Sequence, residues 1–180
     1  MTTHYTQKLH AGAPFPKTEA TLLNGTKVDL TDTIEGCDWK MVVVYRGRHC
    51  PLCTKYLNQL EGFVKPLKDI GVDLIAVSGD SDAQLQQHLE QLEVTFPLAY
   101  GLTTEQMKSL GVYISDPRSP QETDHPFAEP GLFVVNAEGN IQVTDISNNP
   151  FVRPELEALV RGLGWIRNPD NNYPIRGMHV

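Results

Sequence analysis

The chain has 180 residues, a formal net charge of -7 at pH 7 and a hydrophobic content of 40%. This length predicts a single domain over residues 1–180. The polar, proline-containing stretch at 168–180 predicts an extended tail. The acidic balance argues against nucleic acid as a partner, because binding phosphates needs a basic surface. No run approaches the roughly 18 apolar residues of a membrane span, and the polar segment 1–16 does not resemble a signal peptide. We therefore expect a cytoplasmic protein that has no membrane partner.

The first half of the chain predicts a hairpin, a buried strand and a helix, in that order. Residues 18–30 alternate around an Asn-Gly pair, which favours a β-hairpin. The strand predicted at 40–45 contains the unbroken apolar run 41–45, which is typical of a central strand that is buried on both faces. After Cys50, apolar residues at helical spacing predict a helix that Pro66 kinks or ends.

Strands and helices alternate through the second half. Residues 72–78 predict a strand, and Ser81 with Gln84 forms a capping-box pattern for a helix over 82–93. Further patterns predict an extended piece at 96–98, a helix over 103–110, a proline-rich loop over 115–130, strands at 132–136 and 141–146, and a last helix over 154–163. This order predicts an α/β fold with a mixed central β-sheet flanked by helices on both faces.

The most informative motif is Cys50-Pro51-Leu52-Cys53, which lies where the buried strand leads into a helix. A sulfur at a helix N-terminus is stabilised as the thiolate by unpaired N–H groups and the helix dipole, and the second sulfur lies on the same helix face. Arg46, Arg48 and His49 are close in sequence, in a stretch without Asp or Glu. We therefore expect a lowered pKa for the Cys50 thiol.

A zinc site is the alternative interpretation of the cysteine pair. A structural zinc site usually takes two close pairs of ligands, but here only Cys37 and six scattered histidines remain. Redox chemistry without a bound cofactor or metal is therefore favoured.

The basic residues next to Cys50 in the sequence each allow two interpretations. His49 either pairs with the Cys50 thiolate or points away, Arg46 and Arg48 either support the thiolate or are solvated loop charges, and Cys37 is most simply a structural thiol.

Several segments resemble, in their order, one family of the thioredoxin fold. They are "GAPFP", "VVVYRGRHCPLC", "LIAVSGDSDAQL", "VTFPLAYG", "LGVY" and "PGLFVVNAEGNI". Together they are similar to the peroxiredoxins, the alkyl hydroperoxide reductase/thiol-specific antioxidant branch. The resemblance covers about residues 11–165, which implies that these residues form the core of the domain. The resemblance implies a thioredoxin-like fold with an N-terminal hairpin extension, a peroxidatic cysteine at Cys50 and a resolving cysteine at Cys53. It also implies that Pro130 is a cis-proline that faces the active site.

Three positions depart from the pattern that this resemblance implies. Val43 and Gly47 stand where the family usually has a proline and a threonine or serine, and Glu129 stands where it usually has an arginine. The pocket that activates the peroxide is therefore not the standard one. Arg46 and Arg48 are the candidates for the missing positive charge.

Two reactions stay open for Cys50. With a hydroperoxide, the thiolate attacks the O–O bond and forms a sulfenic acid, and Cys53 condenses with it to a disulfide. With a disulfide substrate, Cys50 forms a mixed disulfide that Cys53 resolves. The first reaction, which the resemblance favours, predicts a thiol-dependent antioxidant oxidoreductase that reduces hydroperoxides, and the alternative is a disulfide reductase. Either enzyme is restored by a thioredoxin- or glutathione-type reductant. A non-catalytic redox sensor or binding module is the alternative outside the enzymes, and the resemblance makes a homodimer a candidate assembly.

Overall fold

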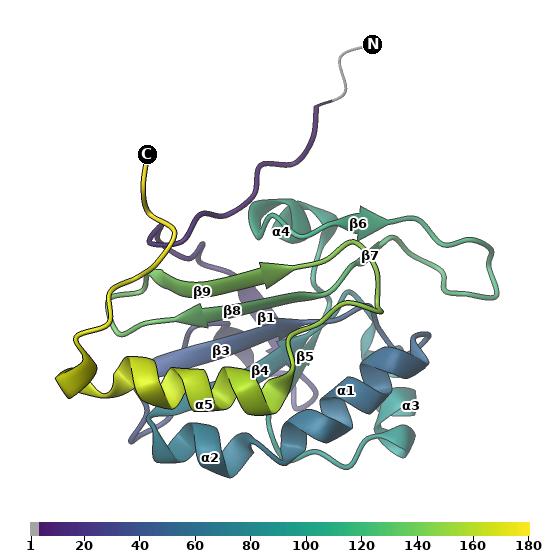
Figure 1. Ribbon diagram of the computed structural model, residues 1–180. Helices are drawn as coiled ribbons and strands as arrows, with labels where there is room; N and C mark the ends of the chain where they lie inside the picture. Colours follow the sequence, from purple (N-terminus) through teal and green to yellow (C-terminus); the bar gives the residue numbers. More distant parts are fainter. Residues whose placement is uncertain (1–3) are drawn as a thin grey trace.

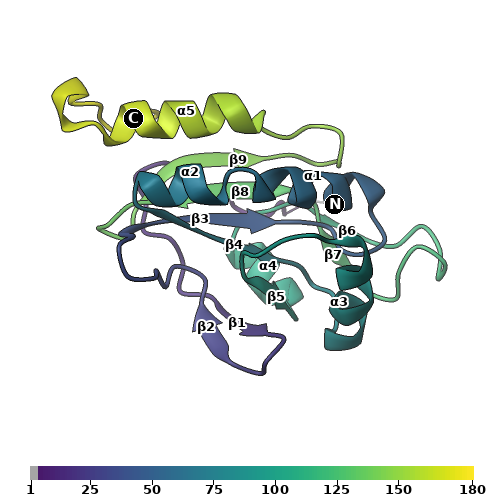
Figure 2. The same cartoon turned by 90° about the horizontal axis from the view of Figure 1, so that it is seen from below.

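A computed structural model describes residues 4–180 as a central β-sheet with helices on both faces (Figures 1 and 2). The strands are β1 (Glu19–Leu22), β2 (Lys27–Asp29), β3 (Trp39–Val44), β4 (Val72–Val77), β5 (Leu98–Tyr100), β6 (Ile114–Ser115), β7 (Phe127–Ala128), β8 (Gly131–Val135) and β9 (Ile141–Ile146). The helices are α1 (Pro51–Glu61), α2 (Val64–Asp69), α3 (Asp82–His88), α4 (Thr104–Ser109) and α5 (Leu156–Arg167), and short 3-10 turns follow at Leu89–Gln91 and Pro169–Asn171.

The main sheet has the strand order β2-β1-β5-β4-β3-β8-β9. Strands β3, β4 and β5 run parallel, whereas the β1–β2 hairpin and the β8–β9 pair are antiparallel additions at the two sides. This arrangement confirms the predicted mixed sheet and the N-terminal hairpin. The segment predicted as a loop over 115–130 differs, because its two ends pair as the small sheet β6–β7.

The central strand β3 separates two hydrophobic cores. Met41 and Val43 belong to the core that includes residues of α1, α2, α3 and α5. Val42 and Val44 belong to the other core, which includes residues of α4, the hairpin and the N-terminal segment. Successive strand residues point to opposite faces, so a strand buried on both faces needs an unbroken apolar run. The apolar run at 41–45 meets this requirement.

The predicted helix after Cys50 is divided into α1 and α2. The break lies at Gly62 and Phe63, ahead of Pro66, which falls within the first turn of α2. A proline is tolerated there because the first-turn amides have no partner within the helix. Pro66 therefore follows the interruption and lies inside the second helix.

The last helix begins and ends later than predicted, at Leu156 and Arg167. The Glu155 side chain caps it by accepting hydrogen bonds from the backbone N–H groups of residues 157 and 158. The helix continues past Leu163 because Ile166 still packs against the core. Among residues 4–180, we find no helix with the length and apolar character that crossing a membrane requires.

Candidate active site

Cys50 occupies the N-cap of α1, directly after the turn that leaves β3. Its backbone is extended, with φ -109° and ψ 103°, and Pro51 is the first helical residue. The Cys53 amide donates a hydrogen bond to Cys50 Sγ over 3.3 Å, so the sulfur itself is the capping group. The positive end of the helix therefore acts on the Cys50 sulfur. Both cysteines are free thiols, with Cys50 2% and Cys53 0% exposed.

The turn before Cys50 depends on Gly47 and Asp80. Gly47 has φ +138°, and a Cβ there would lie 2.5 Å from Asp80 Oδ1. Asp80 is 1% exposed, and its Oδ2 accepts a hydrogen bond from the Arg48 amide at 2.7 Å. The Asp80 carboxylate therefore fills the space that a threonine or serine side chain at position 47 would need. The predicted capping box of Ser81 and Gln84 is confirmed immediately after it.

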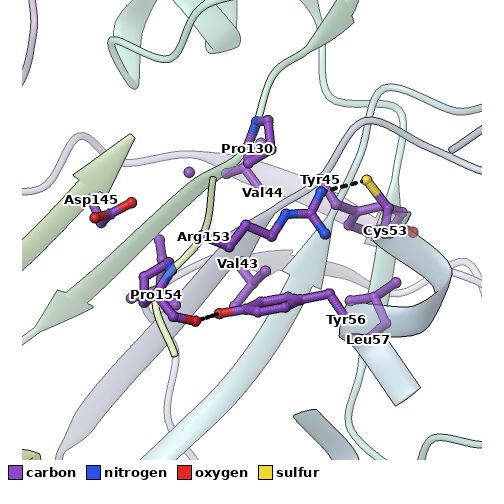
Figure 3. A pocket seen from close by; sticks show the side chains of 12 residues that line it. Val43, Val44, Tyr45, Cys53, Tyr56, Leu57, Pro130, Asp145, Arg153 and Pro154 are labelled. Atoms are coloured by element: carbon purple, nitrogen blue, oxygen red, sulfur yellow. Dashed lines mark hydrogen bonds between the residues drawn. The ribbon is translucent and has the colours of Figure 1, made fainter. Parts of the chain in front are cut away.

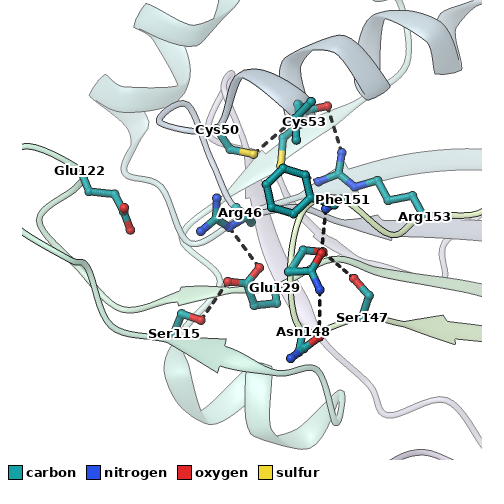
Figure 4. Close-up of polar contacts among 12 residues, drawn as sticks. Arg46, Cys50, Cys53, Ser115, Glu122, Glu129, Ser147, Asn148, Phe151 and Arg153 are labelled. Atoms are coloured by element: carbon teal, nitrogen blue, oxygen red, sulfur yellow. Dashed lines mark hydrogen bonds and ion pairs between the residues drawn. The ribbon is translucent and has the colours of Figure 1, made fainter.

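Arg46 is the arginine that turns toward Cys50 (Figure 4). Its Nε lies 3.0 Å from Glu129 Oε2, and its guanidinium lies over the Phe127 ring, 4.7 Å from the centroid. Glu129 is 3% exposed and also accepts a hydrogen bond from Ser115 Oγ at 2.8 Å. The resemblance implies an arginine at position 129. Glu129 stands there instead, and it pairs with Arg46, which follows the end of β3.

Arg48 and His49 lie differently from Arg46. The Arg48 residue is exposed, and its backbone amide is the group that bonds to Asp80. The His49 ring packs on Phe127 with centroids 4.5 Å apart, and its buried nitrogens have no hydrogen-bond partner among the described residues. Burial, followed by the charge of Arg46, lowers the pKa of His49. His49 is therefore neutral at pH 7 and makes no hydrogen bond to Cys50.

The predicted cis peptide bond at Pro130 is wrong, because residues 4–180 contain no cis peptide bond. The chain passes from β7 to β8 in an extended course. Hydrogen bonds from the Glu129 amide to the Tyr113 carbonyl and from the Ser147 amide to the Pro130 carbonyl hold it there. Pro130 is nevertheless buried and lines an apolar pocket beside Cys53 (Figure 3). Its place next to the site is as expected, and its isomer is not.

Arg153, which the sequence patterns did not single out, contacts the second cysteine. Its Nη2 donates to Cys53 Sγ over 2.7 Å, and its Nη1 donates to the Leu52 carbonyl over 3.1 Å. The guanidinium also lies over the Tyr56 ring, 5.0 Å from the centroid (Figure 3). Arg153 lies in the segment between β9 and α5, 100 residues after Cys53. No local pattern marks such a contact in the sequence.

The two thiols have opposite acidities. A hydrogen bond from the Cys53 thiol is the largest cause that lowers the pKa of Cys50 to about 5; burial opposes this shift, and Arg46 adds to it. Burial and the same hydrogen bond raise the pKa of Cys53, while Arg153 lowers it. Cys50 is therefore the thiolate at neutral pH, and Cys53 is the thiol that donates to it. In residues 4–180, no group of three or more His, Cys, Asp and Glu side chains is arranged to hold a metal ion.

A titration followed by thiolate absorbance should resolve this difference. We expect one thiol to ionise with a pKa of about 5, far below the ordinary value of about 8.5. Burial raises the pKa of both Cys37 and Cys53, so neither should ionise before alkaline pH. The reactivity of Cys50 is then complete at neutral pH and is lost as the pH falls through its pKa. The Cys50→Ser variant should lack the first step, and a first ionisation near pH ~8.5 in the wild type would contradict the assignment.

A thiolate at the N-terminus of a helix that follows the central strand of such a sheet defines a thiol-dependent oxidoreductase of thioredoxin-like fold. The AhpC/TSA family model matches residues 11–144, and the chain belongs to this family. The protein is accordingly an enzyme of the thiol-dependent peroxidase and oxidoreductase class, with an antioxidant role.

Solved structures of the same fold include three peroxiredoxin-type proteins at low sequence identity. A mutant of peroxiredoxin 6 of Arenicola marina has a TM-score of 0.73 at 19% identity, covering 90% of this chain and 75% of that chain. AhpC of Mycobacterium tuberculosis has a TM-score of 0.72 at 17% identity, covering 91% and 96% of the two chains. A peroxiredoxin-like protein from Aquifex aeolicus has a TM-score of 0.71 at 14% identity, covering 87% of each. No curated protein matches the chain.

Proposed function

We propose that this enzyme reduces hydroperoxides, with Cys50 as the attacking thiolate and Cys53 as the resolving cysteine. The observation that carries the proposal is the state of the Cys50 sulfur. It caps α1, accepts the Cys53 amide hydrogen bond at 3.3 Å and has a pKa far below that of an ordinary thiol. The thiolate, and not the thiol, is the nucleophile that attacks a peroxide.

The chemistry proceeds in two steps. The Cys50 thiolate attacks the terminal peroxide oxygen, the O–O bond breaks, and Cys50 becomes a sulfenic acid. The other oxygen leaves as hydroxide or alkoxide and takes a proton from solvent to give water or an alcohol. The Arg46 guanidinium, held by Glu129, stabilises the negative charge that develops on the leaving oxygen. Cys53 then attacks the Cys50 sulfur and releases water, giving a Cys50–Cys53 disulfide. An external dithiol of the thioredoxin type, or glutathione, reduces this disulfide.

Burial of the sulfurs favours a hydroperoxide over a protein disulfide as the substrate. Cys50 is 2% and Cys53 0% exposed, so a bulky disulfide has little access to either sulfur, whereas a small peroxide needs only a narrow approach. The same burial means that a protein reductant acts after the first turn of α1 has opened. We further propose that the chain works as one domain, because its site draws on β3, α1, the segment before β8 and the segment before α5.

Comparing substrates under single-turnover conditions tests the proposal. At pH 7 an ordinary thiol is only a few per cent ionised, so full ionisation of Cys50 gives a rate gain of roughly 30-fold over free cysteine. One preorganised charge at the leaving oxygen adds a factor of roughly 100. We therefore expect thiol loss with stoichiometric hydrogen peroxide, followed by stopped flow, to be about three thousand times faster than for free cysteine. Glutathione disulfide and insulin should react much more slowly. Peroxide reactivity equal to that of a free thiol, together with rapid insulin reduction, would establish the disulfide reductase instead.

A further inference from the structure

We propose that Arg153 is a catalytic residue that activates Cys53, both when the disulfide closes and when it is reduced again. The inference rests on the proposed function, because it assigns a residue to the second half of that reaction. It gives each sulfur its own arginine, Arg46 for Cys50 and Arg153 for Cys53.

The contact that carries this assignment is direct and well anchored. Arg153 Nη2 lies 2.7 Å from Cys53 Sγ, and Cys53 is 0% exposed, so that bulk solvent does not screen a charge on this sulfur. The second branch of the guanidinium donates to the Leu52 carbonyl at 3.1 Å, and its plane lies over the Tyr56 ring. Tyr56 Oη in turn donates to the Pro154 carbonyl at 2.9 Å, so helix α1 and the segment that carries Arg153 hold each other in register (Figure 3).

Arg153 has a larger effect on the ionisation of Cys53 after Cys50 has been oxidised. In the reduced enzyme, Cys53 stays protonated because it is buried and donates its hydrogen to the Cys50 thiolate. Once Cys50 is a neutral sulfenic acid, the negative charge that held this proton is gone, but the contact with Arg153 does not depend on it. A cation beside a buried thiol favours the thiolate. Cys53 therefore keeps its proton while Cys50 is a thiolate, and it loses this proton more readily once Cys50 is a sulfenic acid.

The step balances without any further reactant. The Cys53 sulfur donates its electron pair to the Cys50 sulfur, the S–S bond forms and the S–O bond breaks. The hydroxide that leaves takes up the proton that Cys53 released, so the product is water. In the later reduction step, a reductant thiolate attacks the Cys50 sulfur and forms a mixed disulfide with it, while the Cys50–Cys53 bond breaks and its electron pair goes to Cys53. A second thiol of the reductant then releases Cys50. A thiol leaves faster when its thiolate is stabilised, which is the effect that Arg153 has on Cys53.

The first test separates the two steps of one turnover in Arg153→Met and Arg153→Lys. Arg161→Met is the matched control, because its side chain is 76% exposed on α5. In Arg153→Met we expect disulfide closure to slow by about 100-fold, the lower end of the effect of removing one preorganised donor. Oxidation of Cys50 should change far less, so sulfenic acid accumulates for trapping by dimedone and sulfinic acid increases. The lysine variant should recover part of the closure rate, and the rate in the methionine variant should rise further into alkaline pH. Equal closure rates in Arg153→Met and Arg161→Met would overturn the assignment.

A second measurement keeps the inference testable without peroxide. In a Cys50→Ser background, Cys53 ionises without a neighbouring thiolate, and adding Arg153→Met should shift its thiolate titration to higher pH. Identical titrations, in variants that unfold at the same temperature as their parents, would also overturn the assignment. If the wild type fails to react with peroxide but this shift is found, the proposed substrate is wrong while the role of Arg153 in the Cys53 thiolate stands.

Discussion

Replacing Cys50 with serine should abolish turnover with hydroperoxides, with a loss of about a thousand-fold or more, because a serine hydroxyl is not ionised near neutral pH. Replacing Cys53 with serine should have a different result. The Cys50 thiolate keeps the cap of α1 and the charge of Arg46, so one equivalent of peroxide is still consumed. No disulfide follows, and the sulfenic acid either persists or is oxidised further.

Intact-mass spectrometry after stoichiometric peroxide measures both outcomes in one experiment. The wild type should lose two hydrogens as the disulfide forms, Cys53→Ser should gain one or more oxygens, and Cys50→Ser should remain unchanged. Cys37→Ser is the control, since Cys37 is buried, lies ahead of β3 and has a raised pKa. If Cys50→Ser is oxidised at the wild-type rate, Cys50 is not the attacking residue.

Features that depend on short stretches of chain were predictable from the sequence. The Asn-Gly turn specifies a hairpin by its local geometry, and Ser81 with Gln84 makes both hydrogen bonds of a capping box within one helical turn. The position of Cys50 at the start of a helix follows in the same way from an apolar strand and an apolar stripe on either side. Each of these signals is complete within a few residues.

The partners of the two cysteines were not predictable in this way. Arg46 and Arg48 are both flexible cations beside Cys50 in the sequence, and only the position of Glu129, next to Phe127 on another segment, determines which of them turns inward. Arg153 reaches Cys53 because the chain returns past α1 after β9. The space beside Gly47 is taken by Asp80, which precedes the capping-box pattern of Ser81 and Gln84 and which no pattern in the sequence linked to position 47. Such contacts depend on tertiary packing, which local patterns do not encode.

Replacing Arg46 with methionine should lower both the rate of Cys50 oxidation and the stability of the fold. The rate should fall by about 100-fold, because the variant removes the cation that faces the Cys50 thiolate and, in the proposed reaction, the leaving oxygen. The free energy of unfolding should fall by about 3–5 kcal/mol, because Glu129, whose side chain is 4% exposed, loses the partner of its buried charge. Arg48→Met is the control. Its exposed side chain predicts a rate within about two-fold of the wild type.

The double variant Arg46→Met/Glu129→Gln separates these two effects. Removing both charges leaves no unpaired ion in the site, so we expect the unfolding free energy to recover most of the loss. The oxidation rate should stay low, because the cation beside Cys50 is still absent. Denaturant titration and stopped-flow oxidation of the same samples provide the comparison. If the double variant regains the wild-type rate, Arg46 acts only by supporting the fold; if Arg46→Met reacts as fast as Arg48→Met, its charge does not act on Cys50.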